Sequence, residues 1–177
     1  FNFIVGRFLK IMSEEEAFWM LTMLLESFIP IDYYSKMVGV IVDHNILSML
    51  IEERIPDLYE HLQENYFDPK IVSFQWFSCL FAYNFSFEVI SRIWDLFFLK
   101  GSKILFRISL AVLHMMKSQI MSFQNFEDIM KVFDSIPAHL QDANSIIQVS
   151  NMPKYKIKNK EIDELREEYG SITYEDQ

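Results

Sequence analysis

The stretch S-R-I-W-D-L-F-F-L-K-G-S-K-I-L-F, residues 91–106, decides how the chain folds. Arg92 and Asp95 stand three residues apart, which makes them neighbours on one helix face, and we expect them to form an ion pair. A glycine just after a lysine marks the end of that helix, because Gly101 can adopt the left-handed backbone conformation without strain. Ser102 is then expected to cap a second helix. The stretch therefore predicts two helices joined by a tight turn.

The first of these two helices carries large apolar side chains that cannot all face water. Ile93, Trp94, Phe97 and Phe98 lie within six residues, and Ile104 begins the apolar pattern of the second helix. Aromatic side chains contribute much of the energy of a protein core when they are buried. We therefore expect Trp94 to be buried and the pair of helices to pack against the rest of the chain.

Further helices are predicted on both sides of this pair, and strand signals are few. Ser13 and Glu16 have the spacing of a capping box at the start of a helix that ends near Pro30. That helix is apolar around so much of its circumference that we expect it to be buried on more than one side. Pro56 suits the first position of a helix. The expected helices are 3–12, 14–29, 44–55, 57–65, 69–81, 87–100, 103–121, 126–136 and 143–149, with expected caps at Ser13, Asp43, Asp68, Ser86, Ser102, Asn125 and Asp142.

Composition limits the classes of function. The chain has 177 residues, of which 51% are hydrophobic, so it can build a core. Its formal net charge of −9 argues against a nucleic acid or an anionic membrane as the main partner of the whole domain, although a local basic patch is compatible with it. The single Cys79 cannot form an intramolecular disulfide, which favours a reducing compartment such as the cytoplasm. We find no secretory or transmembrane segment in the sequence.

The chain shows no active site of its own. Its four histidines are scattered, and neither zinc-binding nor calcium-binding spacings occur, so we expect no metal site. The four glycines are isolated, which excludes a glycine-rich phosphate loop. We therefore expect neither catalytic residues nor a cofactor belonging to this chain.

Several short motifs together carry a family resemblance. The run R-I-W-D with Gly101 and Phe106 resembles a signature near the C-terminal end of the TBC domain, the catalytic domain of Rab GTPase-activating proteins. Other motifs follow the order of that family, and they supply the residues to which we assign a structural role. These residues are Glu16, Phe18 and Trp19 of E-x-A-F-W, Tyr33 and Tyr34 of P-x-x-Y-Y, Asp43, Pro56, Trp76 with Phe77 and Phe81 of W-F-x-x-x-F, and Arg92, Trp94, Asp95, Gly101 and Phe106.

The resemblance implies an all-α fold, an orthogonal array of helices that forms the C-terminal lobe of a TBC domain. It assigns residues 1–150 to that domain and 151–177 to a charged, partly helical extension. Members of the family supply an arginine from I-x-x-D-x-x-R and a glutamine from Y-x-Q to the GTPase, and neither motif occurs in this chain. Asn2 resembles the asparagine that follows the glutamine, so we expect the glutamine immediately upstream of residue 1.

The resemblance further implies a role in vesicle traffic, with a Rab-family small GTPase as partner and with GTP and magnesium bound by that partner. We expect a cytoplasmic protein, with peripheral attachment to endomembranes as one possibility, and the oligomeric state stays open. On this interpretation the chain is a supporting lobe, inactive alone. Two alternatives remain: a TBC protein that lacks both fingers and binds partners as a scaffold, and an unrelated helical interaction module.

Three residues are candidates for the Rab-facing surface. Arg7 lies near the glutamine motif, but exposure on a helix surface is the interpretation we favour. Trp76 and Phe77 could anchor an interface, yet aromatic residues at helical spacing more often belong to the core. Arg92 could act as a finger, but we favour its ion pair with Asp95.

The segment after Pro153 changes in composition. Lys154, Lys156, Lys158 and Lys160 alternate with apolar residues, and an acidic amphipathic run follows. A membrane-surface or partner-binding element is one interpretation. We favour a solvated, partly helical extension, because the acidic run cancels the basic one.

Overall fold

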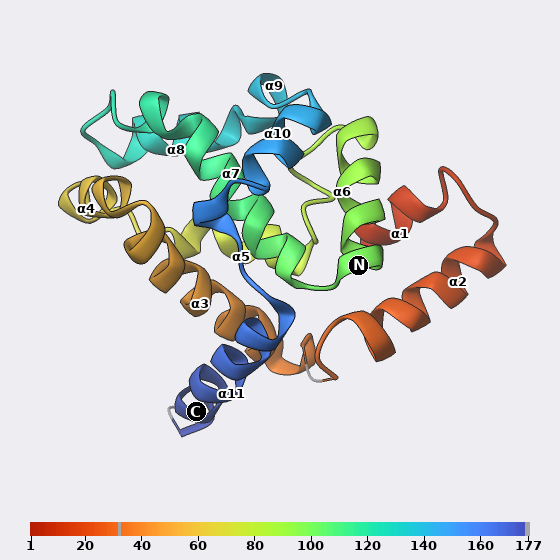
Figure 1. The fold of residues 1–177 in the computed structure, drawn as a ribbon. Helices are drawn as coiled ribbons and strands as arrows, with labels where there is room; N and C mark the ends of the chain where they lie inside the picture. Colours follow the sequence, from red (N-terminus) through yellow and green to blue (C-terminus); the bar gives the residue numbers. More distant parts are fainter. Residues whose placement is uncertain (32, 176–177) are drawn as a thin grey trace.

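The structure, a computed structural model, describes residues 1–31 and 33–175. Within these ranges all regular secondary structure is helical, which confirms the expected all-α class (Figure 1). The helices are α1 (Asn2–Phe8), α2 (Glu14–Met23), α3 (Val38–Arg54), α4 (Pro56–Glu64), α5 (Lys70–Ser78), α6 (Phe87–Lys100), α7 (Lys103–Ile120), α8 (Phe126–Asp134), α9 (Ile136–His139), α10 (Ala143–Ser150) and α11 (Asn159–Glu175). Short π or 3₁₀ turns occur at Leu24–Phe28, Ser35–Met37 and Pro153–Tyr155.

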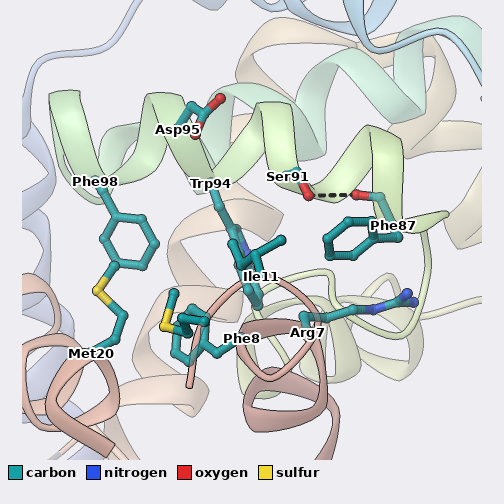
Figure 2. A pocket seen from close by; sticks show the side chains of 10 residues that line it. Arg7, Phe8, Ile11, Met20, Phe87, Ser91, Trp94, Asp95 and Phe98 are labelled. Carbon is teal, nitrogen blue, oxygen red and sulfur yellow. Dashed lines mark hydrogen bonds between the residues drawn. The ribbon is translucent and has the colours of Figure 1, made fainter. Parts of the chain in front are cut away.

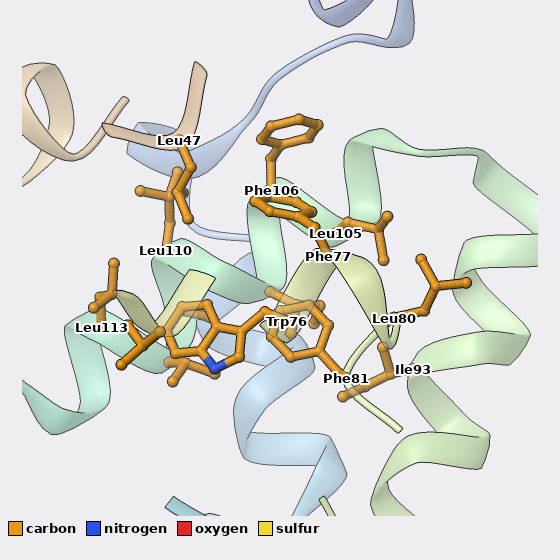
Figure 3. Packing of buried hydrophobic residues seen from close by; sticks show 14 of the residues in the cluster. Leu47, Trp76, Phe77, Leu80, Phe81, Ile93, Leu105, Phe106, Leu110 and Leu113 are labelled. Atoms are coloured by element: carbon orange, nitrogen blue, oxygen red, sulfur yellow. The ribbon is translucent and has the colours of Figure 1, made fainter. Parts of the chain in front are cut away.

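The core forms around α7, the second helix of the pair predicted from residues 91–106. Most of its side chains are buried, because α5, α6, α8 and α10 all contact it. Figure 3 shows aromatic rings from α5 packing against this helix, with Phe77 and Phe106 at a centroid distance of 5.2 Å. Trp94 of α6 is only 6% exposed, so its predicted burial is confirmed.

Local capping explains where several helices begin. Ser13 and Glu16 form the predicted capping box, and Ser86, Asn125 and Asp142 each accept a backbone N–H of the helix that follows. These side chains satisfy amide groups that a helix start otherwise leaves without partners. Ser102 differs, because its hydroxyl accepts a hydrogen bond from Arg166 and caps nothing.

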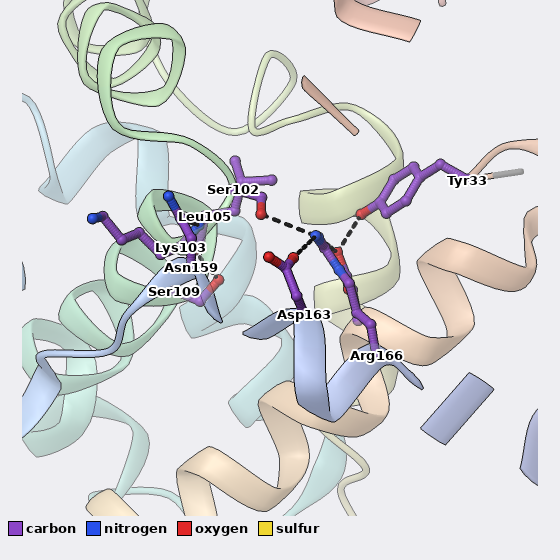
Figure 4. A network of polar contacts seen from close by, with 9 residues as sticks. Tyr33, Ser102, Lys103, Leu105, Ser109, Asn159, Asp163 and Arg166 are labelled. Carbon is purple, nitrogen blue, oxygen red and sulfur yellow. Dashed lines mark hydrogen bonds and ion pairs between the residues drawn. The ribbon is translucent and has the colours of Figure 1, made fainter. Parts of the chain in front are cut away.

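Asp43 was wrongly predicted to cap a helix. Helix α3 begins five residues earlier, at Val38, and places Asp43 inside it with no solvent exposure. The carboxylate accepts two hydrogen bonds from Arg166, at 2.8 and 2.7 Å, and one from the hydroxyl of Tyr33 at 2.9 Å (Figure 4). These three hydrogen bonds from two partners stabilise a charge in the interior by satisfying the lone pairs of the carboxylate.

The segment that follows residue 150 is packed against the domain, so the expectation of a solvated extension is wrong. Tyr155, Ile157 and Ile162 are buried in the common core. Helix α11 lies along α3, where Arg166 reaches Asp43 (Figure 1). The division of the chain at residue 150 stays a prediction, and residues 176–177 lie outside the described part.

Helix α2 is far more exposed than its apolar sequence predicts. Phe18 and Trp19 are 62% and 58% exposed, and Ala17 is the helix's one buried residue. Figure 1 shows α2 running along the edge of the molecule, where few other helices reach it. The expectation that this helix is buried on more than one side is wrong for this chain.

The turn between α6 and α7 has the predicted geometry, whereas the predicted ion pair beside it is absent. Gly101 has a φ of +84°, in the region that favours glycine. Arg92 and Asp95 are both exposed, and within the described residues they form no ion pair. In water, the entropy that two flexible side chains lose when they are held together costs about as much free energy as the attraction of their charges provides.

Candidate functional site

Aromatic side chains, three of them exposed and Tyr34 partly buried, surround the start of α1, the segment that carries Asn2. The ring of Phe1 meets Tyr34 edge-on with centroids 4.7 Å apart, and Phe3 meets Tyr83 in the same manner at 5.0 Å. Phe1, Phe3 and Tyr83 are each about half exposed, and Asn2 is exposed between them. We call Phe1, Phe3, Tyr34 and Tyr83 the α1 aromatic surface. Partly exposed aromatic residues of this kind are enriched in protein interfaces.

Arg7 fixes the orientation of α1 against the loop of residues 79–86. Its Nε and Nη2 atoms donate to the carbonyl oxygen of Ala82 at 3.2 and 2.9 Å, and Nη2 also donates to Phe85 O at 3.0 Å. The favoured interpretation of Arg7 as a solvated helix residue is therefore wrong. Charged donors form stronger hydrogen bonds than neutral ones, and the planar guanidinium bonds several acceptors in one geometry.

The same loop is also held by α6. The indole Nε1 of Trp94 donates to the carbonyl oxygen of Leu80 at 2.9 Å. Leu80 and Phe81 have positive φ values of 47° and 62°, which ends α5 before the predicted residue 81. A reversal of this kind needs outside support, because left-handed backbone is costly for residues other than glycine. Trp94 and Arg7 supply that support, and together they position Tyr83.

Trp76 and Phe77 do not belong to this surface. They are 1% and 0% exposed, because α5 directs both rings into the core against α7 (Figure 3). Their assignment as candidates for the Rab-facing surface is wrong, and the core interpretation is confirmed. The aromatic residues that do face solvent here, Phe3 and Tyr83, were missed because nothing in the local pattern distinguishes them from core residues.

A small cavity separates α1, α2 and α6. Its volume is about 130 Å³, and its walls are mostly apolar, with Phe8, Met20, Trp94 and Phe98 among them. Figure 2 shows the guanidinium of Arg7 pointing away from Met20 and Phe98, and the hydroxyl of Ser91 is used within α6, where it donates to Phe87 O. The cavity therefore offers packing space and few polar groups that could orient a reacting substrate.

The remaining arginines are held by other contacts or lie on the surface. Arg54 pairs with Glu53 at 3.3 Å, and Arg107 is buried and donates to Ser150 O at 2.9 Å. Burial lowers the pKa of Arg107. Arg166 is the arginine that sequence reasoning missed, and the available signal was its place four residues after Ile162, on the apolar face of an acidic helix.

Residues 1–31 and 33–175 contain neither a metal-binding cluster nor a membrane-spanning helix. In them no group of three or more His, Cys, Asp or Glu side chains is arranged to hold a metal ion. Every helix in these residues is too short or too polar to cross a bilayer.

Comparison with known proteins identifies the family. The model of the Rab-GTPase-TBC domain matches residues 1–121. The chain belongs to the TBC domain family. The solved TBC domain of a Chlamydomonas flagellar RabGAP has a TM-score of 0.77 and 29% identity, with 85% of this chain and 50% of that chain covered.

Curated relatives agree with this assignment to the TBC family. Human small G protein signaling modulator 3 is 33% identical over 143 residues, which are 80% of this chain and 19% of that protein. Human TBC1 domain family member 2B is 31% identical over 150 residues, 84% of this chain and 16% of that protein. The chain thus spans about a fifth of the length of the curated relatives it matches.

Proposed function

We propose that this chain is the supporting lobe of a GTPase-activating protein for Rab-family small GTPases, acting in vesicle traffic. The observation that carries the proposal is the bonding of Arg7 to loop 79–86, which sets the direction of α1 and the α1 aromatic surface around Asn2. From the family resemblance we expect the glutamine that enters the GTPase site immediately before this helix. The lobe would thus hold the glutamine in place without contributing a reacting group.

The chemistry of this proposal belongs to the GTPase and to the finger residues. The GTPase would bind GTP and magnesium, and an arginine supplied in trans stabilises the charge that develops on the transferred phosphoryl group. Such an arginine accelerates hydrolysis by about 10³–10⁵-fold in related systems. Because neither finger motif occurs in the 177 residues, we expect this chain alone to leave GTP hydrolysis unchanged.

The role of Arg7 as a positioning residue can be tested in the full-length protein by single-turnover GTP hydrolysis. Arg7→Met removes the bonds to loop 79–86, and we expect the maximal rate to fall by about 100-fold, as small misplacements of catalytic groups do. Arg92→Met is the matched control, since Arg92 is exposed on α6. An Arg7→Met protein that folds normally and keeps the full rate would contradict the proposal.

The alternative from the sequence, a scaffold that binds a GTPase without catalysis, has a different result in the same assay. It would bind a GTP-loaded Rab without accelerating hydrolysis, even with Arg7 intact. Substitution of Phe3 and Tyr83 by serine would weaken binding in both cases, so binding alone does not distinguish the two functions.

A further inference from the structure

The connection between α10 and α11, a 3₁₀ turn at Pro153–Tyr155 followed by residues 156–158, exposes three lysines. Lys154, Lys156 and Lys158 are exposed, whereas Tyr155 and Ile157 between them are buried. After the 3₁₀ turn, Lys156 and Lys158 alternate with buried Ile157 as in an extended chain, whereas Lys154 lies within the turn with its Nζ 4.8 Å from the centroid of the Tyr155 ring. The burial of Tyr155 and Ile157 therefore leaves these three lysines exposed to solvent.

Two further lysines are brought to the end of this segment by Asn159. Its side-chain amide donates to Lys100 O at 2.8 Å, and its carbonyl oxygen accepts from Lys103 N at 3.2 Å. Figure 4 shows Asn159 and Lys103 side by side at the start of α11. We call Lys100, Lys103, Lys154, Lys156 and Lys158 the lysine stripe.

The lysine stripe is a local cluster of positive charge in a chain whose net charge is −9. Within the described residues, none of the five lysines forms an ion pair. Lys160, the next lysine, is excluded from the stripe because it pairs with Glu164 at 3.3 Å. Two acidic groups of α11 lie beside the stripe: Glu161, which accepts the backbone N–H of Lys158 at 3.5 Å, and Asp163, which is turned toward Arg166. The five lysines of the stripe are therefore not paired with the acidic residues that follow them in the described chain.

We propose that the lysine stripe binds the anionic headgroups of a lipid bilayer. Lysine ammonium groups are mobile point charges, which suit a diffuse anionic surface better than a fixed carboxylate. Leu99, next to Lys100, is 77% exposed and supplies an apolar side chain able to enter the headgroup region. This apolar residue favours a membrane over an acidic protein segment. The inference does not depend on GTPase activation.

The test is co-sedimentation of the 177-residue chain with vesicles of phosphatidylcholine alone or mixed with phosphatidylserine. We expect binding to the anionic vesicles only, and we expect salt to weaken it because exposed charges are screened. Lys154→Gln, Lys156→Gln and Lys158→Gln combined should reduce the affinity by about 100-fold, since each lysine near an anionic bilayer contributes about fivefold.

A matched control removes three positive charges outside the lysine stripe. Lys36→Gln, Lys70→Gln and Lys131→Gln lie outside the stripe, and the triple control should bind nearly as well as the unchanged chain. Leu99→Ala should weaken binding without changing its dependence on salt. Circular dichroism and thermal unfolding establish that each variant is folded.

Three results would overturn the inference. One is equal binding to neutral and anionic vesicles, and another is full binding by the folded Lys154, Lys156 and Lys158 variant. The third is tight binding to poly-glutamate with none to anionic vesicles, which would assign the stripe to an acidic protein partner.

Discussion

Arg166 in α11 and Asp43 in α3 form a two-bonded ion pair although 123 residues separate them in the chain. The Arg166 side chain is 13% exposed and that of Asp43 is fully buried. Burial alone would lower the pKa of Arg166, but the charge and hydrogen bonds of Asp43 raise it. Burial, followed by the charge of Asp43, raises the pKa of Tyr33 well above its usual value, which keeps its hydroxyl a donor. The pair joins α11 to α3.

Arg166→Met should therefore be strongly destabilising. It leaves the charge of Asp43 buried without its main partner, and removal of one partner of a buried pair costs about 3–5 kcal/mol. Urea denaturation followed by circular dichroism measures the free energy of unfolding. Arg92→Met, at an exposed position without an ion pair in the described residues, should change it by less than about 0.5 kcal/mol. Equal stability of the two variants would mean that α11 is not docked as described.

Trp94→Ala should destabilise the protein by about 3–5 kcal/mol, because it removes a large buried ring and leaves a cavity. Trp94→Phe should cost less, since it keeps most of the apolar volume and loses chiefly the hydrogen bond to Leu80 O. Denaturant unfolding of both variants checks the order. If the free energy of unfolding of Trp94→Ala matched that of the unchanged protein, the indole would not be buried.

Substitution of glycine by alanine should destabilise the protein at position 101 and stabilise it at position 6. Gly101→Ala places a Cβ 2.8 Å from Asn159 Nδ2 at a φ of +84°, and left-handed backbone alone costs about 1–2 kcal/mol. Gly101→Val should be worse, because a branched side chain resists this conformation more. Gly6→Ala lies within α1 with no atom in the way, so it should stabilise the protein by about 0.5–1 kcal/mol. Thermal unfolding distinguishes these signs, and a neutral Gly101→Ala would contradict the assigned turn.

Stability should decline as the pH falls from about 6.5 toward 4, partly because of His44. Burial, with a smaller contribution from Lys70, lowers the pKa of this imidazole from 6.5 to about 4 in the folded chain. Between these values the unfolded chain binds the proton and the folded chain does not, so acid favours unfolding. His44→Gln should flatten this part of the stability profile. An unchanged slope in the His44 variant would show that His44 does not contribute.

Local sequence signals predicted the helical elements well where their causes are local. Ser13, Ser86, Asn125 and Asp142 cap the helices that follow them, since each contacts amide groups within three residues. Gly101 ends α6 because its own backbone adopts a positive φ, which is again a local cause. The apolar spacing around Trp94 likewise requires burial on one helix face.

The sequence predictions were wrong where the environment of a residue depends on parts of the chain that are distant in sequence. Asp43 has the chemistry of a cap, and only contact with Arg166 reveals its place inside α3. Phe18 and Trp19 satisfy an apolar helical pattern, but pattern alone does not say whether another helix covers them. Arg7 was interpreted as solvated because the carbonyl groups that it binds lie 75 and 78 residues away. The candidate site depends on such distant contacts and was therefore less predictable than the helices.

The measurement that tests the central claim most directly is single-turnover GTP hydrolysis by a panel of GTP-loaded Rab proteins. It compares the full-length protein with the 177-residue chain at equal concentration. The supporting-lobe account predicts acceleration by about 10³–10⁵-fold with the full-length protein on at least one Rab, and none with the chain alone. Acceleration of that size by the chain alone, or its absence with the full-length protein on every Rab, would contradict the account.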